Sequence, residues 1–155
     1  GAGWNLILAT DVILASDEAV FASPFAKFGL VPDAGGTFFL PKVVGMFRAK
    51  DLIFSQRRIG AKEALEMGLV TEVVPHEQLM ERTDHWTNLF LDSSPAATGM
   101  TKALLNLSDK EDLDAMLEFE SYAQCIAMMT PDHREAVRAF VHRRKANFQR
   151  NEKEM

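Results

Sequence analysis

The pattern of apolar residues changes once along the chain, at Val74-Pro75-His76, and this change limits the folds that the sequence can adopt. Before it, short apolar runs typical of strands are interspersed with helix-like stretches. After it, apolar residues recur at steps of three and four, the spacing of amphipathic helices, and no strand pattern returns. The sequence therefore predicts an α/β segment over residues 1–75 and a helical segment over residues 76–155.

The first segment is expected to alternate short helices and strands. We predict a short buried helix from Gly3 to Thr10, with turn residues separating the two strands that follow. A later helix is interrupted by Pro41, and another ends at Gly68, because proline and glycine break helices there. The remaining expected elements are the strands Val12–Ser16, Ala19–Ala22 and Leu69–Val74 and the helical runs Phe38–Val44 and Arg48–Ser55.

The second segment carries clear signals of helix starts. Ser94-Pro95 and Thr130-Pro131 each place a capping hydroxyl before a proline at the first helical position. Residues 78–91 form a further expected helix. The apolar residues between Leu113 and Ile126 form an amphipathic stripe, which is typical of a core or a subunit interface rather than of a cofactor site.

Composition excludes several classes of function. Of the 155 residues, 47% are hydrophobic and 25% are charged, as in a globular protein, and the net charge of −5 argues against a nucleic-acid partner. No stretch has the length of a membrane span, and no signal peptide is evident. The single cysteine, Cys125, excludes an internal disulfide and suits the cytoplasm. The histidines lack metal-ligand spacing, so we predict no metal site.

One carboxylate, Asp33, stands in a break between apolar runs, in Val-Pro-Asp-Ala-Gly-Gly-Thr. A carboxylate among apolar residues is a candidate proton carrier. Aspartate after proline is also a common turn residue, whose side chain accepts hydrogen bonds from nearby amides. From the residues alone, the turn is the favoured interpretation.

Two other features allow more than one interpretation. Gly1-Ala2-Gly3 could present backbone amides to a developing negative charge, or could simply reverse the chain tightly. The basic residues from Arg143 to Lys145 could be a solvated helix end or could hold a phosphate group.

Taken together, three stretches resemble the crotonase superfamily, the enoyl-CoA hydratase and isomerase group. They are "GAGWNLILATDVILASDEAVFASPFAKFGLVPDAGGTFFLPKVVG", "RRIGAKEALEMGLVTEVV" and "AFVHRRKANF". The resemblance implies a spiral of ββα turns, present in part over residues 1–75, followed by helices over residues 76–155 that pack in a homotrimer or a dimer of trimers. Family members carry a substantial part ahead of the Gly-Ala-Gly position, so this chain resembles a C-terminal piece.

The resemblance also implies a site. The substrate would be an acyl-CoA thioester, with no separate cofactor, and the backbone amide of Ala2 would be one donor of the oxyanion hole. Hydratases of the family carry two glutamates where this chain has Asn5 and Phe25, so water addition is not expected. Asp33 falls where several isomerases carry a catalytic aspartate, among them the ring-epoxide isomerase of phenylacetyl-CoA breakdown.

Further residues take roles through the same resemblance. Asn5, Phe25 and Gly36 would line the acyl pocket. Phe140 and Arg143 resemble family positions near the CoA bound to a neighbouring subunit.

Three hypotheses remain open at this point. The first is an acyl-CoA isomerase in which Asp33 moves a proton during a double-bond shift. The second is an aryl-CoA dehalogenase in which Asp33 is the nucleophile, and the aromatic Phe25 is compatible with it. The third is a non-catalytic module that binds CoA esters or assembles subunits.

Overall fold

The computed structural model describes residues 1–149, so residues 150–155 of the predicted helical segment lie outside the described part. The chain divides into two compact units, Gly1–Asp84 and a second unit that starts at His85.

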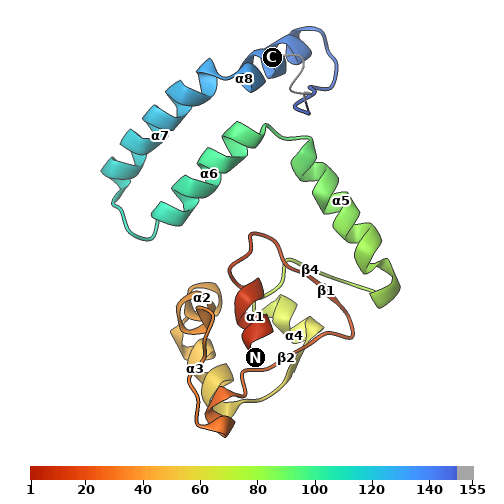
Figure 1. The fold of residues 1–155 in the computed structure, drawn as a ribbon, viewed down its shortest axis with the longest axis vertical. Helices are drawn as coiled ribbons and strands as arrows, with labels where there is room; N and C mark the ends of the chain where they lie inside the picture. Colours follow the sequence, from red (N-terminus) through yellow and green to blue (C-terminus); the bar gives the residue numbers. More distant parts are fainter. Residues whose placement is uncertain (150–155) are drawn as a thin grey trace. The chain divides into compact units, whose positions relative to one another are not determined.

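The first unit mixes short helices and short strands, as the alternating sequence pattern predicts (Figure 1). Its elements are α1 (Ala2–Ile7), β1 (Leu14–Ser16), β2 (Val20–Phe21), the 3-10 helix η1 (Phe25–Phe28), α2 (Gly36–Val44), α3 (Met46–Ser55), β3 (Ile59–Gly60), α4 (Ala61–Glu66), β4 (Glu72–Val74) and the 3-10 helix η2 (His76–Gln78).

Strand pairing in this unit joins segments that are far apart in the sequence. β1 pairs with β4 in parallel, with Ala15 opposite Val73, and β2 pairs with β3 antiparallel, with Phe21 opposite Ile59. The strands predicted at 12–16, 19–22 and 69–74 are therefore present but shorter. β3 was not predicted, because a two-residue strand has too little pattern to detect.

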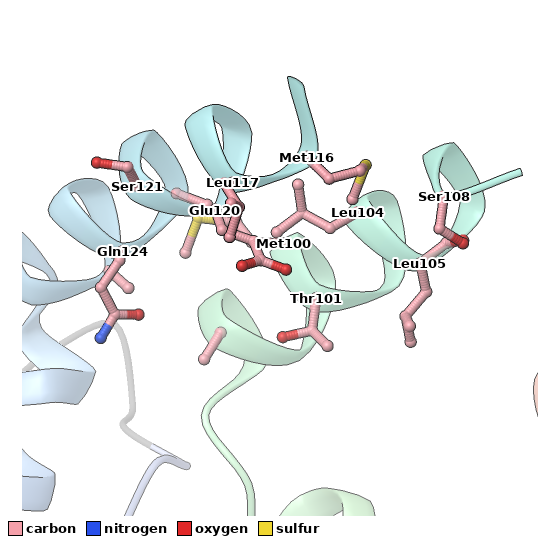
Figure 2. A pocket seen from close by; sticks show the side chains of 13 residues that line it. Met100, Thr101, Leu104, Leu105, Ser108, Met116, Leu117, Glu120, Ser121 and Gln124 are labelled. Atoms are coloured by element: carbon pink, nitrogen blue, oxygen red, sulfur yellow. The ribbon is translucent and has the colours of Figure 1, made fainter. Parts of the chain in front are cut away.

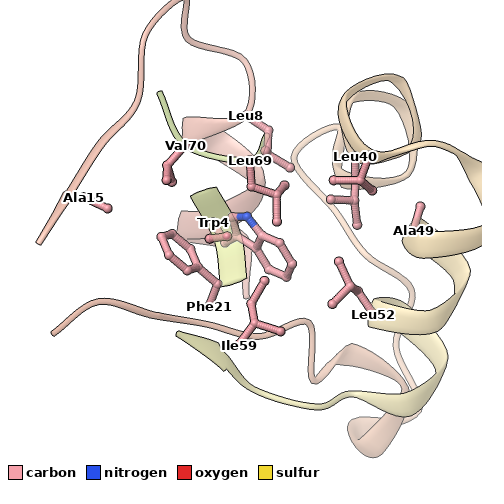
Figure 3. Packing of buried hydrophobic residues seen from close by; sticks show 12 residues of the cluster. Trp4, Leu8, Ala15, Phe21, Leu40, Ala49, Leu52, Ile59, Leu69 and Val70 are labelled. Carbon is pink, nitrogen blue, oxygen red and sulfur yellow. The ribbon is translucent and has the colours of Figure 1, made fainter. Parts of the chain in front are cut away.

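The core of the first unit collects apolar side chains from most of its elements. Trp4 of α1 packs against Phe21 of β2 with ring centroids 6.0 Å apart. Figure 3 shows these two rings beside Ile59, with Leu52 and Leu40 on the side of α3 and α2. Leu52 and Ile59 are each only 1% exposed. Full burial of one such side chain stabilises a fold by about 1.5–3 kcal/mol, so this cluster holds α1 against the rest of the unit.

The predicted interruption at Pro41 is wrong. α2 runs without a break from Gly36 to Val44 and contains Pro41 in its interior, and the amide of Gly45 still bonds to the carbonyl of Pro41. A proline inside a helix removes one backbone hydrogen bond and its ring crowds the carbonyl four residues earlier, so the helix loses stability there. Packing of Leu40 and Val44 into the core offsets that loss.

The helices from residue 79 onward are α5 (Leu79–Leu91), α6 (Pro95–Leu107), α7 (Leu113–Met129) and α8 (Pro131–Val141). α5 begins in the first unit and ends in the second. In the second unit, α6 and α7 lie side by side as a helical hairpin (Figure 1).

The two predicted caps are confirmed. Ser94 accepts a hydrogen bond from the amide of Ala97 at the start of α6, and Thr130 accepts one from His133 at the start of α8. Side-chain caps of this kind are each worth about 1 kcal/mol.

The second unit has little core of its own among the described residues. The apolar stripe of α7 stays largely at the surface, with Leu113 71% and Ile126 53% exposed, whereas Glu135 and Ala139 of α8 are buried. Every helix within residues 1–149 is too short or too polar to cross a lipid bilayer.

Candidate active site

Asp33 opens a tight turn. Its carbonyl oxygen accepts a hydrogen bond of 2.8 Å from the amide of Gly36, and the two residues between them have positive φ angles, 47° at Ala34 and 79° at Gly35. Two successive positive φ angles are the signature of a type I′ turn. Asp33 is therefore a turn residue, as its local sequence favours, and its side chain is exposed where it can meet a ligand.

The turn is fastened to α1 by Asn5. The side-chain Nδ2 of Asn5 donates a hydrogen bond of 3.0 Å to the carbonyl oxygen of Asp33. Asn5 is 2% exposed. A Cβ atom on Gly36 would lie 2.4 Å from Cγ of Asn5, so only glycine fits there.

The start of α1 meets the segments that carry the other predicted pocket residues. The Gly1 nitrogen donates a hydrogen bond of 2.7 Å to the carbonyl of Ala22, three residues before Phe25. The amide of Ala2 lies at this same end of α1, and first-turn amides have no acceptor within their own helix.

Phe25 begins η1 and is half-buried. The carbonyl of Phe25 accepts a hydrogen bond from Leu30, and Gly29 ends the 3-10 helix with a φ of 68°. Phe25 and Asp33 therefore lie on either side of one short connection, and hydrogen bonds to Gly1 and Asn5 hold both flanks of that connection to α1.

Phe140 and Arg143 belong to the second unit. Phe140 is 84% exposed in the last turn of α8, and Arg143 follows with a φ of 50°. Arg144 pairs with Glu135, and Lys145 pairs with Asp92. Arg143 has no ion-pair partner among residues 1–149, so it is the basic side chain of this cluster that remains available to a ligand.

An apolar groove of about 620 Å³ lies between α6 and α7. In Figure 2, Leu104 of α6 extends toward Met116 of α7, with Glu120, Ser121 and Gln124 further along the same helix. Among the described residues, Glu120 is the only charged side chain that lines this groove, so the groove offers a surface for packing rather than a catalytic constellation.

Sequence reasoning did not identify the strained Ala34, the fastening role of Asn5, or the buried hydroxyl of Ser23, which has no hydrogen-bond partner among the described residues. None carries a local signal, because each depends on a neighbour that is distant in the chain or on a backbone angle. Within the described residues, no three His, Cys, Asp or Glu side chains are grouped as a metal ion requires.

Similar proteins carry names from one family. Residues 1–151 match the family Enoyl-CoA hydratase/isomerase. A short-chain-enoyl-CoA hydratase of Clostridium acetobutylicum is 37% identical over 94% of this chain and 56% of its own length. A 1,2-epoxyphenylacetyl-CoA isomerase of Escherichia coli is 34% identical over 96% of this chain and 56% of its own.

Solved structures agree with these relatives. The crystal structure of an enoyl-CoA hydratase/isomerase from Cupriavidus metallidurans CH34 superposes with a TM-score of 0.87 at 38% identity, covering 96% of this chain and 56% of that one. An enoyl-CoA hydratase from Bacillus anthracis gives a TM-score of 0.86 at 33% identity, covering 92% and 55%.

The chain thus spans a little more than half the length of the relatives that it matches. The α/β architecture, the order of the motifs and the match over residues 1–151 agree. The chain belongs to the enoyl-CoA hydratase/isomerase family, and with it to the crotonase superfamily.

Proposed function

We propose that the complete protein containing this chain is an acyl-CoA isomerase in which Asp33 carries the proton. The observation behind this proposal is the pairing of an exposed carboxylate, held on a turn against α1, with two positions that lack the hydratase glutamates. Asn5 and Phe25 occupy those positions, and neither side chain exchanges a proton at neutral pH.

The reaction would proceed through an enolate. Asp33 removes a proton from a carbon next to the thioester carbonyl, and the electron pair of the broken C–H bond moves toward the carbonyl oxygen. The amide of Ala2 and a second N–H donor stabilise that oxygen, as in other oxyanion holes. In the family, the second donor comes from the part that precedes the Gly-Ala-Gly position. Protonated Asp33 then returns the proton to another carbon of the acyl chain.

The acyl pocket in this proposal includes Asn5, Phe25 and Gly36. Half-buried Phe25 supplies an apolar wall. Phe140 and Arg143 bind the CoA portion of a substrate held by a neighbouring subunit. The thioester is the substrate, and no separate cofactor takes part.

Asp33→Asn in the complete protein tests the proposal. We expect the rate of double-bond migration in a straight-chain 3-enoyl-CoA, or of rearrangement in 1,2-epoxyphenylacetyl-CoA, to fall by a factor of at least about 100, because general acid–base groups contribute about 10² to 10⁴. Glu18→Gln makes the same carboxylate-to-amide change at an exposed turn and serves as the control. A rate near that of the wild type in Asp33→Asn would reject the assignment.

The aryl-CoA dehalogenase is the second candidate function. In it, the Asp33 carboxylate attacks the halogen-bearing ring carbon of a haloaryl-CoA and halide leaves, and the aromatic Phe25 is compatible with such a substrate. It predicts a covalent aryl ester on Asp33 after incubation with a haloaryl-CoA. Mass spectrometry of the Asp33 peptide distinguishes the two, since the isomerase forms no adduct.

The third candidate function is a non-catalytic module that binds CoA esters or assembles subunits. Binding of a CoA thioester by the complete protein, without turnover of either isomerase substrate or adduct formation, would support it.

We further propose that residues 1–75 form part of a spiral core and that residues 76–155 assemble the protein into a homotrimer or a dimer of trimers. The proposed location is the cytoplasm. The exposed apolar stripe of α7 and the groove beside α6 support this proposal. Sedimentation analysis of the complete protein tests it. A monomer at micromolar concentration would reject it.

A further inference from the structure

We infer that Asn5 is a positioning residue for Asp33, holding the turn that aims the Asp33 carboxylate. This inference rests on the proposed role of Asp33 as proton carrier. It assigns Asn5 a task that differs from contact with the acyl group.

The hydrogen bonding at the Asp33 carbonyl is saturated. Its oxygen accepts one bond from the Gly36 amide at 2.8 Å and one from Nδ2 of Asn5 at 3.0 Å. A carbonyl oxygen has two lone pairs, so both are used. Because Asn5 is 2% exposed, water competes little with its bond, and the orientation of the Asp33–Ala34 peptide is well defined.

The turn needs such a support because its geometry is unfavourable for Ala34. Ala34 has a φ of 47°, in the left-handed region that residues with a Cβ atom rarely adopt. Strained backbone of this kind persists where the surroundings hold it in place. The bond from Asn5 acts on the peptide that links Asp33 to Ala34, which is the peptide that must be turned.

Packing adds a second constraint from the same side chain. An atom at the Cβ position of Gly36 would lie 2.4 Å from both Cγ and Nδ2 of Asn5 and 2.5 Å from its Oδ1. The Asn5 amide therefore lies directly against the backbone where α2 begins. One side chain thus fixes both ends of the turn, Asp33 through a hydrogen bond and Gly36 through contact.

The hydrogen bond to the Asp33 carbonyl requires an N–H or O–H donor on the side chain at position 5. An ionised carboxylate accepts hydrogen bonds and cannot donate one to the Asp33 carbonyl, whereas an amide can. An ionised aspartate at position 5 therefore cannot hold the Asp33 turn through this hydrogen bond at neutral pH.

The first test measures kcat and KM for a straight-chain 3-enoyl-CoA in the complete protein. For Asn5→Ala and Asn5→Asp we expect kcat to fall about 10- to 100-fold, with KM changing less than about threefold, because a small misplacement of a catalytic group has costs of that size. Val70→Ala removes methyl groups from the core at a residue outside the turn, and its kcat should match the wild type.

The pH profile separates positioning from a purely structural role. A protonated Asp at position 5 can donate to the Asp33 carbonyl, so the ratio of kcat for Asn5→Asp to that of the wild type should rise as the pH falls. Asn5→Ala has no proton to give, and its ratio should stay flat. A flat ratio for both variants would overturn the inference.

The second test needs no turnover. Gly36→Ala should lower the melting temperature strongly in the wild-type background and much less in Asn5→Ala, which vacates the space that the new Cβ requires. Equal losses in the two backgrounds would contradict the contact. If Asn5→Ala does not fold, Asn5→Asp keeps the side-chain volume and carries the kinetic test.

The two proposals fail in different ways. Full activity in Asp33→Asn rejects the proposed function. Loss of activity in Asp33→Asn together with wild-type kcat in both Asn5 variants rejects only the positioning role.

Discussion

The guanidinium of Arg144 donates two hydrogen bonds to the carboxylate of Glu135, from Nη1 to Oε1 at 2.5 Å and from Nη2 to Oε2 at 3.0 Å. Glu135 also accepts a hydrogen bond from the amide of Asn147, which ties the chain after α8 back to that helix. The basic cluster predicted from the sequence therefore contains residues with different tasks. Arg144 stabilises the fold, while neighbouring Arg143 has no ion-pair partner within residues 1–149.

We expect Arg143→Ala to weaken the binding of a CoA thioester such as butyryl-CoA by about tenfold in the complete protein, because a hydrogen bond to a charged group is worth about 1.5–3 kcal/mol. Isothermal titration calorimetry measures the affinity. Lys145→Ala is the matched control, since the Lys145 ammonium is already paired with Asp92 at 2.6 Å and a surface pair contributes at most about 1 kcal/mol. Unchanged affinity in Arg143→Ala would mean that Arg143 is only a solvated cation.

Gly35 and Gly99 should respond to alanine with opposite signs. Gly35 has a φ of 79°, and its Cβ would lie 2.7 Å from Cε2 of Phe39. Gly35→Ala should therefore lower the free energy of unfolding by about 2–4 kcal/mol, from backbone strain and overpacking together. Gly99 lies inside α6 with no atom within 4 Å of its Cβ position, so Gly99→Ala should raise that free energy by up to about 1 kcal/mol. Denaturant titration of both variants measures the two changes in the free energy of unfolding. Changes of the same sign would contradict this explanation.

Ala34→Gly should separate stability from activity. Glycine relieves the left-handed strain at φ 47°, which costs about 1–2 kcal/mol for alanine, although it adds freedom to the unfolded chain. The net expectation is a free energy of unfolding that is unchanged or higher by up to about 1 kcal/mol. The turn also becomes more flexible, so kcat for a 3-enoyl-CoA should fall a few-fold. A clear loss of stability would show that Ala34 is not strained.

Tyr122 should titrate above the ordinary range of a phenol, about pH 10. Its hydroxyl donates a hydrogen bond to the carboxylate of Glu118, which raises the pKa of Tyr122, and slight desolvation of the exposed ring adds to the increase. Because the folded pKa exceeds the unfolded one, the stabilisation is complete below the unfolded pKa and is lost as the pH rises through the folded pKa.

A pH titration followed by phenolate absorbance measures this pKa, and the part of the signal that is absent in Tyr122→Phe belongs to Tyr122. Glu118→Ala should move its midpoint down toward that of a free tyrosine. An unmoved midpoint would exclude the contribution of Glu118.

The sequence alone determined the features that depend on neighbours in the chain. Ser94-Pro95 and Thr130-Pro131 predicted helix starts that the structure confirms, because a cap needs only an oxygen three residues from its donor. The apolar stripe of residues 113–126 predicted α7 for a similar reason, since the helical repeat is local. The family also followed from sequence, through the order of three motifs.

The tertiary structure decided what depends on distant partners. The continuity of α2 through Pro41 follows from packing in the core, which no local rule contains. Asp33 was visible as a candidate and as a turn residue, yet the sequence could not relate it to Asn5, 28 residues earlier. Such a contact exists only once α1 and α2 share a core, because hydrophobic burial brings the two helices together and the hydrogen bond then selects their register.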